Sequence, residues 1–164
     1  MLAHRLAKNI QSLAGQLDTA VHVAEIRLLW EESTELLRKL HGCDPRQYDA
    51  DFSRTLYHLG THLCRAGYWK RAERSLREAS RLYRGLYNGD TASENNCDGL
   101  AWTLLEYAKS LEKLERNDEA YRTTREAIAL CRRLFENRYG AVATQIPAAV
   151  RSYGDFLFGL GTGF

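Results

Sequence analysis

The stretch that decides the fold is residues 56–86, LYHLGTHLCRAGYWKRAERSLREASRLYRGL, because the chain contains it a second time in related form. Shifted by 48 positions, it aligns with residues 104–134, LLEYAKSLEKLERNDEAYRTTREAIALCRRL. The aligned positions that are both large and apolar, or both small, are Leu56 with Leu104, Leu59 with Tyr107, Gly60 with Ala108, Leu63 with Leu111, Ala72 with Ala120, Ala79 with Ala127, Leu82 with Leu130 and Leu86 with Leu134. Self-similarity at a fixed period indicates stacked units that bury their apolar faces against one another.

Weaker copies flank this pair on both sides. A shift of 46 places Ile10, Leu13, Ala14, Leu17, Leu36 and Leu40 on Leu56, Leu59, Gly60, Leu63, Leu82 and Leu86. Downstream, Val150, Tyr153, Gly154 and Leu157 align with Leu104, Tyr107, Ala108 and Leu111. We therefore expect one domain over residues 1–164, with units at about 3–41, 52–87 and 99–138, a partial unit at about 147–160, and about seven helices in all.

The apolar spacing within each unit is that of a helix. Leu56, Leu59, Gly60 and Leu63 recur at i, i+3, i+4 and i+7, and the alternation that indicates strands is absent. Short breaks at residues 65–67 and 115–117 separate paired helices, and longer polar breaks at 42–51 and 88–99 separate units. The sequence predicts an all-α fold.

Small residues recur where paired helices have to approach closely. Ala14, Gly60, Ala108 and Gly154 occupy one matched position in the first helices. In the second helices, Ala72 matches Ala120, and Ala79 matches Ala127. Small side chains at such crossings let two helices pack at short distance while larger neighbours fill the flanks.

The pattern Leu56, Leu59-Gly60, Leu63, Gly67, Ala72, Leu76 and Ala79 resembles the tetratricopeptide repeat family. Two features depart from that family: the period is 46 to 48 residues rather than 34, and Arg84 replaces the closing proline. The long period is similar to the repeats of kinesin light chains and of fungal and bacterial repeat arrays. The resemblance implies a right-handed α-solenoid of antiparallel helix pairs, with about three units plus one extra C-terminal helix.

Composition limits the classes of partner. The chain has 27% charged and 45% hydrophobic residues, typical of a soluble helical protein, and its net charge of +2 predicts no polyanionic partner by bulk charge. No apolar stretch is long enough to span a bilayer, and the four cysteines are far apart without a C-x-x-C pair. We expect a cytoplasmic protein with reduced thiols and no membrane partner.

The leading hypothesis is a scaffold that binds a partner peptide or helix. In the family that the chain resembles, first helices line a concave groove. The matching positions here are Arg54, Tyr57, His58, Thr61, Arg65, Trp102, Leu105, Glu106, Lys109, Lys113 and, in the last helix, Arg151. Aromatic anchors beside cations suit a protein segment of some acidic character. The alternative is that Trp102 and Leu105 simply pack against a neighbouring unit.

The runner-up hypothesis is self-assembly through an exposed end of the stack. The last predicted helix carries Tyr153, Phe156, Leu157, Phe158 and Leu160, and no second helix follows it. Its apolar side has to be buried against something. We expect either that the chain is a piece of a longer array or that this end docks on a second copy, which would give a homo-oligomer.

A third hypothesis concerns a basic stripe on the second helix of the middle unit. Lys70, Arg74, Arg77, Arg81 and Arg84 lie on the side opposite the apolar residues. Such a stripe can bind nucleic acid, but we favour a solvated face in which Glu73 and Glu78 pair with the cations, and we do not expect nucleic acid as a partner.

Motifs for catalysis are weak. His58 and His62 have the i, i+4 spacing of two metal ligands, but no third ligand is spaced to join them. Cys64 lies six residues from His58, on another side of the helix, which suits neither a nucleophile nor its base. We expect no enzyme activity, no catalytic residues, no metal and no cofactor.

Overall fold

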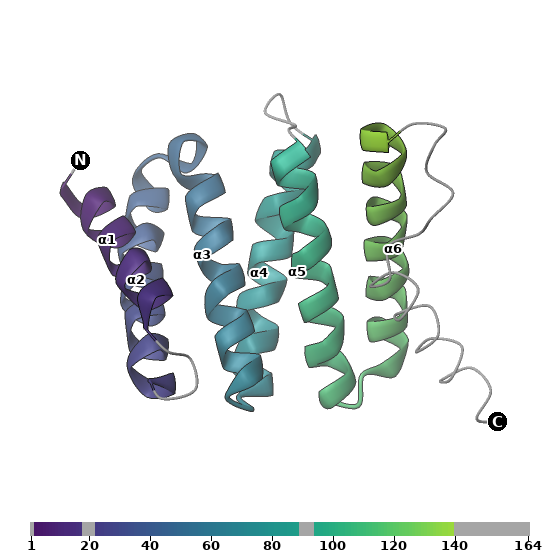
Figure 1. Ribbon diagram of the computed structural model, residues 1–164, viewed down its shortest axis with the longest axis horizontal. Coiled ribbons are helices and arrows are strands. Elements are labelled where there is room, and N and C mark those ends of the chain that lie inside the picture. Colours follow the sequence, from purple (N-terminus) through teal and green to yellow (C-terminus); the bar gives the residue numbers. More distant parts are fainter. Residues whose placement is uncertain (1, 18–21, 89–93, 140–164) are drawn as a thin grey trace.

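The computed structural model describes residues 2–17, 22–88 and 94–139 of the chain. These residues form six α-helices, which pack in sequential antiparallel pairs (Figure 1). The helices are α1 (Leu2–Gln16), α2 (Val23–Cys43), α3 (Pro45–Arg65), α4 (Trp69–Asn88), α5 (Glu94–Lys113) and α6 (Asn117–Tyr139). The all-α prediction is confirmed. The further helix predicted at about 147–160 lies outside the described residues.

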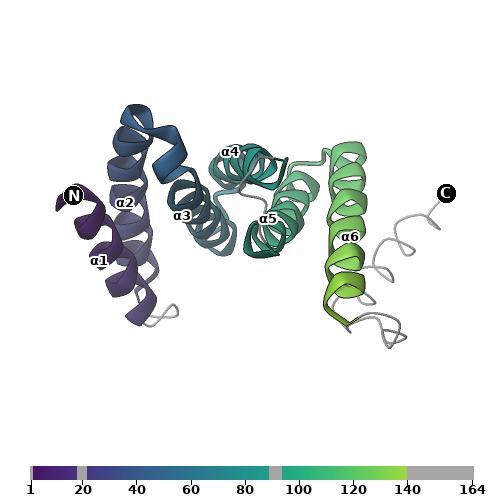
Figure 2. The ribbon, with the colours of Figure 1, turned by 90° about the horizontal axis from the view of Figure 1, so that it is seen from above.

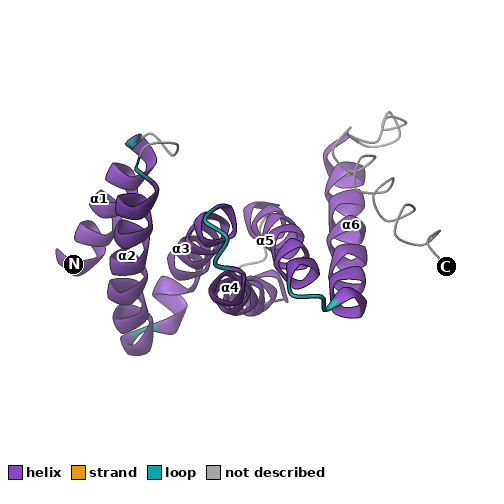
Figure 3. Cartoon of the chain, turned by 90° about the horizontal axis from the view of Figure 1, so that it is seen from below, coloured by secondary structure: helices purple, strands orange, loops and turns teal. Residues whose placement is uncertain are grey.

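The helices form a row in chain order. The α1–α2 pair lies at one end and α6 at the other, and α1, α3 and α5 share one side of the row (Figure 2). Each helix packs against the next one along the chain, and α3 also contacts α5. Helices joined by short connections make up the described part of the molecule, as Figure 3 shows. None of the described helices is long and apolar enough to cross a membrane.

The prediction of a polar break at residues 42–51 is wrong. Helix α3 begins at Pro45, so that a single residue, Asp44, separates it from α2. The Asp44 side chain accepts a hydrogen bond from the Gln47 backbone N–H at 3.2 Å. A capping aspartate followed by proline at the first helical position is a strong start signal, which outweighs the polar composition of the turn. Helix α5 likewise begins at Glu94, before the predicted start at Gly99.

The turns within the two central helix pairs have the same geometry 48 residues apart. Gly67 and Glu115 both adopt positive φ, of 79° and 61°. Beyond α3, the Tyr68 N–H donates to the Leu63 carbonyl at 2.9 Å. Beyond α5, the equivalent bond runs from the Arg116 N–H to the Leu111 carbonyl at 3.0 Å. Both α3 and α5 therefore end in a Schellman motif, which satisfies their last carbonyl groups.

Replacing Glu115 with glycine should raise the free energy of unfolding by up to about 1 kcal/mol, because the left-handed conformation is strained for residues with a Cβ. Gly67→Ala is the matched control and should lower the free energy of unfolding by about the same amount. Urea denaturation measures both. A stabilised Gly67→Ala variant would contradict the expectation.

The core confirms the expected role of the small residues. Ala14, Ala72, Ala79, Ala108 and Ala127 are all buried. A Cβ added at Gly60 would stand 2.5 Å from Leu76 Cγ, and Leu76 is itself fully buried. Gly60 on α3 therefore permits the close approach of α4. At Gly99 a Cβ would stand 2.5 Å from Tyr83 Cε1, so α5 and α4 make the same kind of contact.

Candidate functional site

The candidate site is the solvent side of α1, α3 and α5, here called the α1–α3–α5 face. It contains Lys8 and Gln11 of α1 and the predicted groove residues of α3 and α5, which are Arg54, Tyr57, His58, Thr61, Arg65, Trp102, Leu105, Glu106, Lys109 and Lys113. All of these are exposed or partly exposed, whereas the opposite sides of α3 and α5 are buried. Arg151, the remaining predicted groove residue, lies outside the described residues.

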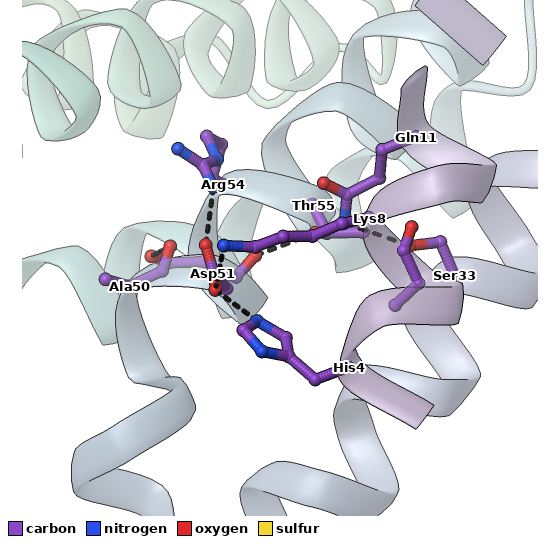
Figure 4. Close-up of polar contacts among 10 residues, drawn as sticks. His4, Lys8, Gln11, Ser33, Ala50, Asp51, Arg54 and Thr55 are labelled. Carbon is purple, nitrogen blue, oxygen red and sulfur yellow. Dashed lines mark hydrogen bonds and ion pairs between the residues drawn. The ribbon is translucent and has the colours of Figure 1, made fainter. Parts of the chain in front are cut away.

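A network around Asp51 joins α1 to α3 (Figure 4). The Asp51 carboxylate lies 2.7 Å from His4 Nε2 and 3.6 Å from Lys8 Nζ, and it also pairs with Arg54. Burial opposes ionisation of Asp51, but the hydrogen bond with His4 and the charges of Arg54 and Lys8 outweigh it, so the pKa of this carboxyl is lowered. Lys8 and Arg54 thus share one carboxylate, which offsets one of their two positive charges.

A second polar contact lies next to this network. Gln11 Nε2 donates to Thr55 Oγ1 at 2.8 Å and to Ser33 Oγ at 3.0 Å, which ties α1 to α3 and α2 (Figure 4). Ser33 in turn donates to the Ala7 carbonyl at 3.3 Å. These bonds satisfy buried hydroxyl groups, so Gln11 has a structural role at this position.

The histidines of α3 stack on a tryptophan of α2. The rings of His58 and His62 lie 4.8 and 6.0 Å from the ring of Trp30, at interplanar angles of 22° and 26°. Burial, the charge of Arg54 and the neighbouring His62 lower the pKa of His58 to about 4. Burial and Arg65 also lower the pKa of His62. Both rings are therefore neutral at physiological pH and present a flat, uncharged surface.

The α3–α5 junction brings a tyrosine and a glutamate together. Tyr57 is half-buried and packs against all three clusters of core residues. Its pKa is raised by burial and by the charge of Glu106. Glu106 Oε2 is buried without a hydrogen bond, and its nearest cation is Lys109 Nζ at 3.8 Å. Thr61 donates to the Tyr57 carbonyl at 3.0 Å, so its hydroxyl is already occupied.

Trp102 and Leu105, which the sequence left open, differ in environment. Leu105 is partly buried and packs against the core cluster that includes Leu100 and Leu104. Trp102 is 55% exposed, although it is the largest apolar side chain on α5. Packing against core residues thus explains the position of Leu105. It does not explain Trp102, because more than half of that side chain is exposed to solvent.

Unmatched positive charge lies at the C-terminal ends of α3 and α5. Arg65 and Lys113 are exposed, and neither has an ion-pair partner within residues 2–17, 22–88 and 94–139. Lys109 is also exposed and has only the long contact with Glu106. The positive charge of the α1–α3–α5 face is therefore partly offset near Asp51, whereas that of Arg65 and Lys113 is not offset by any ion pair among the described residues.

Some residues of the basic stripe on α4 form ion pairs with acids, and others do not. Arg84 makes a two-pronged contact with Glu126, at 2.9 and 2.8 Å, and Arg77 lies 3.7 Å from Glu73. We expected Glu73 to be solvated, but it is buried. Arg116 of the α5–α6 turn lies over it, with Arg116 Nη1 at 3.2 Å from Glu73 Oε1. Glu78 pairs with Arg38 of α2 rather than with the stripe. Of the five stripe residues, Lys70, Arg74 and Arg81 are exposed and have no ion-pair partner among the described residues.

Several features were missed in the sequence. Asp51 and Trp30 were not assigned to the site, and His4 was not paired with an acid. The Asp44-Pro45 start signal would have extended α3 back over Asp51 and placed that residue one turn before Thr55. No local signal marks the contact of Trp30 with α3, because it joins two different helices.

The described residues contain no group of three or more His, Cys, Asp or Glu side chains that is arranged to hold a metal ion. Burial raises the pKa of the Cys64 thiol to about 12, with a smaller contribution from Glu106, which makes it a poor nucleophile.

Comparison with known proteins found no matching family model, no matching curated protein and no matching solved structure.

Proposed function

We propose that this chain is a tetratricopeptide-like interaction scaffold, which acts by binding rather than by catalysis and receives a segment of a partner protein on the α1–α3–α5 face. The observation that carries the proposal is the exposed Trp102, which lies on the same face as Arg65 and Lys113, two exposed cations that have no ion-pair partner among the described residues. The equivalent Schellman turns 48 residues apart support a repeated helix-pair unit. Tryptophan and arginine are the residues that most often carry the free energy of protein binding.

The distribution of charge specifies the partner further. Lys8 and Arg54 share the Asp51 carboxylate and Lys109 contacts Glu106, whereas Arg65 and Lys113 have no acidic partner among the described residues. The acids of a partner should therefore meet Arg65 and Lys113 first, with Lys109 between Lys113 and Trp102 on α5. At 1.5 Å per residue, Lys109 and Lys113 lie about 10 and about 16 Å along α5 from Trp102. An extended peptide advances about 3.3 Å per residue. The expected ligand therefore has an apolar anchor, with acidic residues about three to five positions away.

Selection of binding peptides from a random library displayed on phage tests this proposal and does not require the natural partner to be identified. Wild-type protein should enrich peptides that have this spacing of apolar and acidic residues. The selected peptides should bind Trp102→Ala about tenfold or more weakly, which corresponds to the loss of about 1.4 kcal/mol or more.

The matched control is Tyr121→Ala. Tyr121 is 50% exposed, close to the value for Trp102, but it lies on α6 outside the α1–α3–α5 face. Its replacement should leave peptide binding unchanged, whereas Lys113→Glu should weaken the binding of acidic peptides. Equal effects of Trp102→Ala and Tyr121→Ala, with both variants folded by circular dichroism, would refute this site.

A further inference from the structure

The two acids that were expected to balance the basic stripe on α4 contact cations of neighbouring elements. Glu78 lies 3.1 Å from Arg38 of α2. Glu73 is buried, and its carboxylate lies 3.2 Å from Arg116 and 3.7 Å from Arg77. The exposed cations of α4 that therefore have no ion pair among the described residues are Lys70, Arg74 and Arg81.

Helix α6 extends this positive charge, because it lies beside α4. The side-chain contacts that join α4 to α6 and to the turn before it are Glu73 with Arg116, Arg84 with Glu126 and Tyr87 with Arg133. The exposed cations of α6 that form neither these contacts nor an ion pair among the described residues are Arg122, Arg125 and Arg132. The name α4–α6 basic surface is used below for Lys70, Arg74, Arg81, Arg122, Arg125 and Arg132.

The cations of both helices lie on the same side of the molecule. At about 100° per residue, those of each helix lie about 140–180° around it from its buried alanine, which is Ala79 in α4 and Ala127 in α6. These two alanines are equivalent residues of the repeat and pack toward α3 and α5. The α4–α6 basic surface is therefore on the side of the row away from the α1–α3–α5 face.

The remaining acids do not balance this surface. Glu126 and Glu119 each form a two-pronged contact with an arginine outside the surface, Arg84 and Arg116. Glu115 and Asp118 are exposed without an ion pair among the described residues, but both lie at the N-terminal end of α6. The surface is thus most positive away from that end, around Arg81 and Arg125.

We propose that the α4–α6 basic surface binds the phosphate backbone of a nucleic acid. All of its cations except Lys70 are arginines, whose guanidinium groups can form two parallel hydrogen bonds with a phosphate. From Lys70 to Arg81 the surface extends about 16 Å along α4, which corresponds to about five base-pair steps of about 3.4 Å. Helix α4 lies between α2 and α6, to which Arg71 and Arg84 join it. It cannot enter a groove, so it contacts phosphates rather than base edges and reads no sequence.

The lack of exposed aliphatic residues distinguishes this partner from a membrane or an acidic protein. Among the described residues, the exposed large aliphatic side chains are all in α1 and α2, and α4 and α6 expose only Tyr121 of this class. Membrane-surface helices and the centres of protein interfaces bury apolar side chains. Nucleic-acid interfaces are more polar and more positively charged, as this surface is.

Binding of nucleic acid here does not depend on the proposed function, because it uses no residue of the α1–α3–α5 face. Trp102→Ala should therefore leave it unchanged. The sequence alone did not favour this partner, because Glu73 and Glu78 were expected to pair with the stripe and the arginines of α6 were not known to lie beside α4.

Fluorescence anisotropy of the complete chain with labelled duplex DNA and with labelled single-stranded RNA, both of mixed sequence, measures this binding over a range of salt concentrations. The affinity of the wild type should fall steeply as salt is added, because each neutralised phosphate releases its counterions. Arg81→Gln combined with Arg125→Gln should weaken binding at least about tenfold at low salt. The slope of log affinity against log salt should decrease in magnitude by about 2, one for each lost contact.

The matched control is Arg5→Gln combined with Arg46→Gln. It removes the same net charge from exposed arginines of α1 and α3, which also have no ion pair among the described residues. This control should bind nearly as the wild type does, with both double variants folded by circular dichroism. An equal loss in the two double variants would overturn the proposal, because it would show an effect of bulk charge alone.

Vesicles that contain phosphatidylserine provide the other anionic partner for comparison. Binding to neither nucleic acid at about 50 mM salt would overturn the proposal. Binding to the vesicles alone, lost in Arg81→Gln combined with Arg125→Gln, would also overturn it and would assign the surface to anionic lipid.

Discussion

Replacing Leu76 with alanine is expected to lower the free energy of unfolding by about 2–5 kcal/mol. Leu76 is fully buried and belongs to a core cluster with residues from all six described helices. Its side chain fills the space that Gly60 leaves open on α3, because the Cγ lies only 2.5 Å from where a Cβ of residue 60 would stand. Truncation therefore removes contacts and leaves a cavity between the two helices.

The same geometry predicts strong coupling between the two positions. Gly60→Ala alone should cost about 1–3 kcal/mol, because neither Leu76 nor the helix backbone can move freely in a packed core. In the double variant the added methyl group occupies part of the cavity, so the combined loss should be smaller than the sum of the single losses.

Urea denaturation of the four proteins in this cycle measures the coupling. Gly85→Ala in α4 is the control, since nothing lies within 4 Å of its Cβ position. It should raise the free energy of unfolding by about 0.5–1 kcal/mol, as expected for glycine in an open helical position. Simple additivity of Gly60→Ala and Leu76→Ala would show that the side chain and the glycine do not share this space.

Acid is expected to destabilise the protein in a window set by His58. Its pKa is 6.5 when unfolded and about 4 when folded, since burial among Trp30, His62 and Arg54 disfavours the imidazolium ion. Between these values the unfolded state binds more protons than the folded state. The contribution of neutral His58 to the free energy of unfolding therefore falls as the pH decreases from 6.5, and it is absent below 4. The full loss amounts to about 3 kcal/mol.

His58→Gln should remove most of this pH dependence, because glutamine does not titrate. His62 retains a smaller slope in the same direction, since its pKa is also lowered. Asp51 contributes in a separate range: its folded pKa is lowered, so its stabilisation is lost only as the pH falls below the usual value of 3.8. Urea midpoints measured at intervals from neutral pH to pH 4 test this. An unchanged slope in His58→Gln would assign the acid sensitivity to other groups.

Local features of the chain could be read directly from the sequence. The helical stripes, the small residues at helix crossings and the breaks at residues 65–67 and 115–117 all depend on neighbouring residues, so their signals lie close together in the chain. The start of α3 was local too, but the polar composition around Asp44 and Pro45 obscured it. A capping residue sets the first residue of a helix through one hydrogen bond, whereas composition gives only the average polarity of a segment.

The candidate site was predicted less completely. The face that carries Arg54 and Trp102 follows from helical periodicity, but the chemical state of its residues does not. Asp51 pairs with two of the cations, and burial together with neighbouring positive charge keeps neutral the two histidines that stack on Trp30. These contacts join residues on different helices.

The sequence by itself determined that the chain is helical, which side of each helix is apolar and where helices can approach closely, because periodicity and side-chain size act within one or two turns. Only the tertiary structure decided which charges are matched, that Glu73 is buried beneath Arg116, and that Trp102 and the leucines of α1 remain exposed. The physical reason is that burial and charge pairing depend on the neighbouring helix. That neighbour is set by the packing of the whole row.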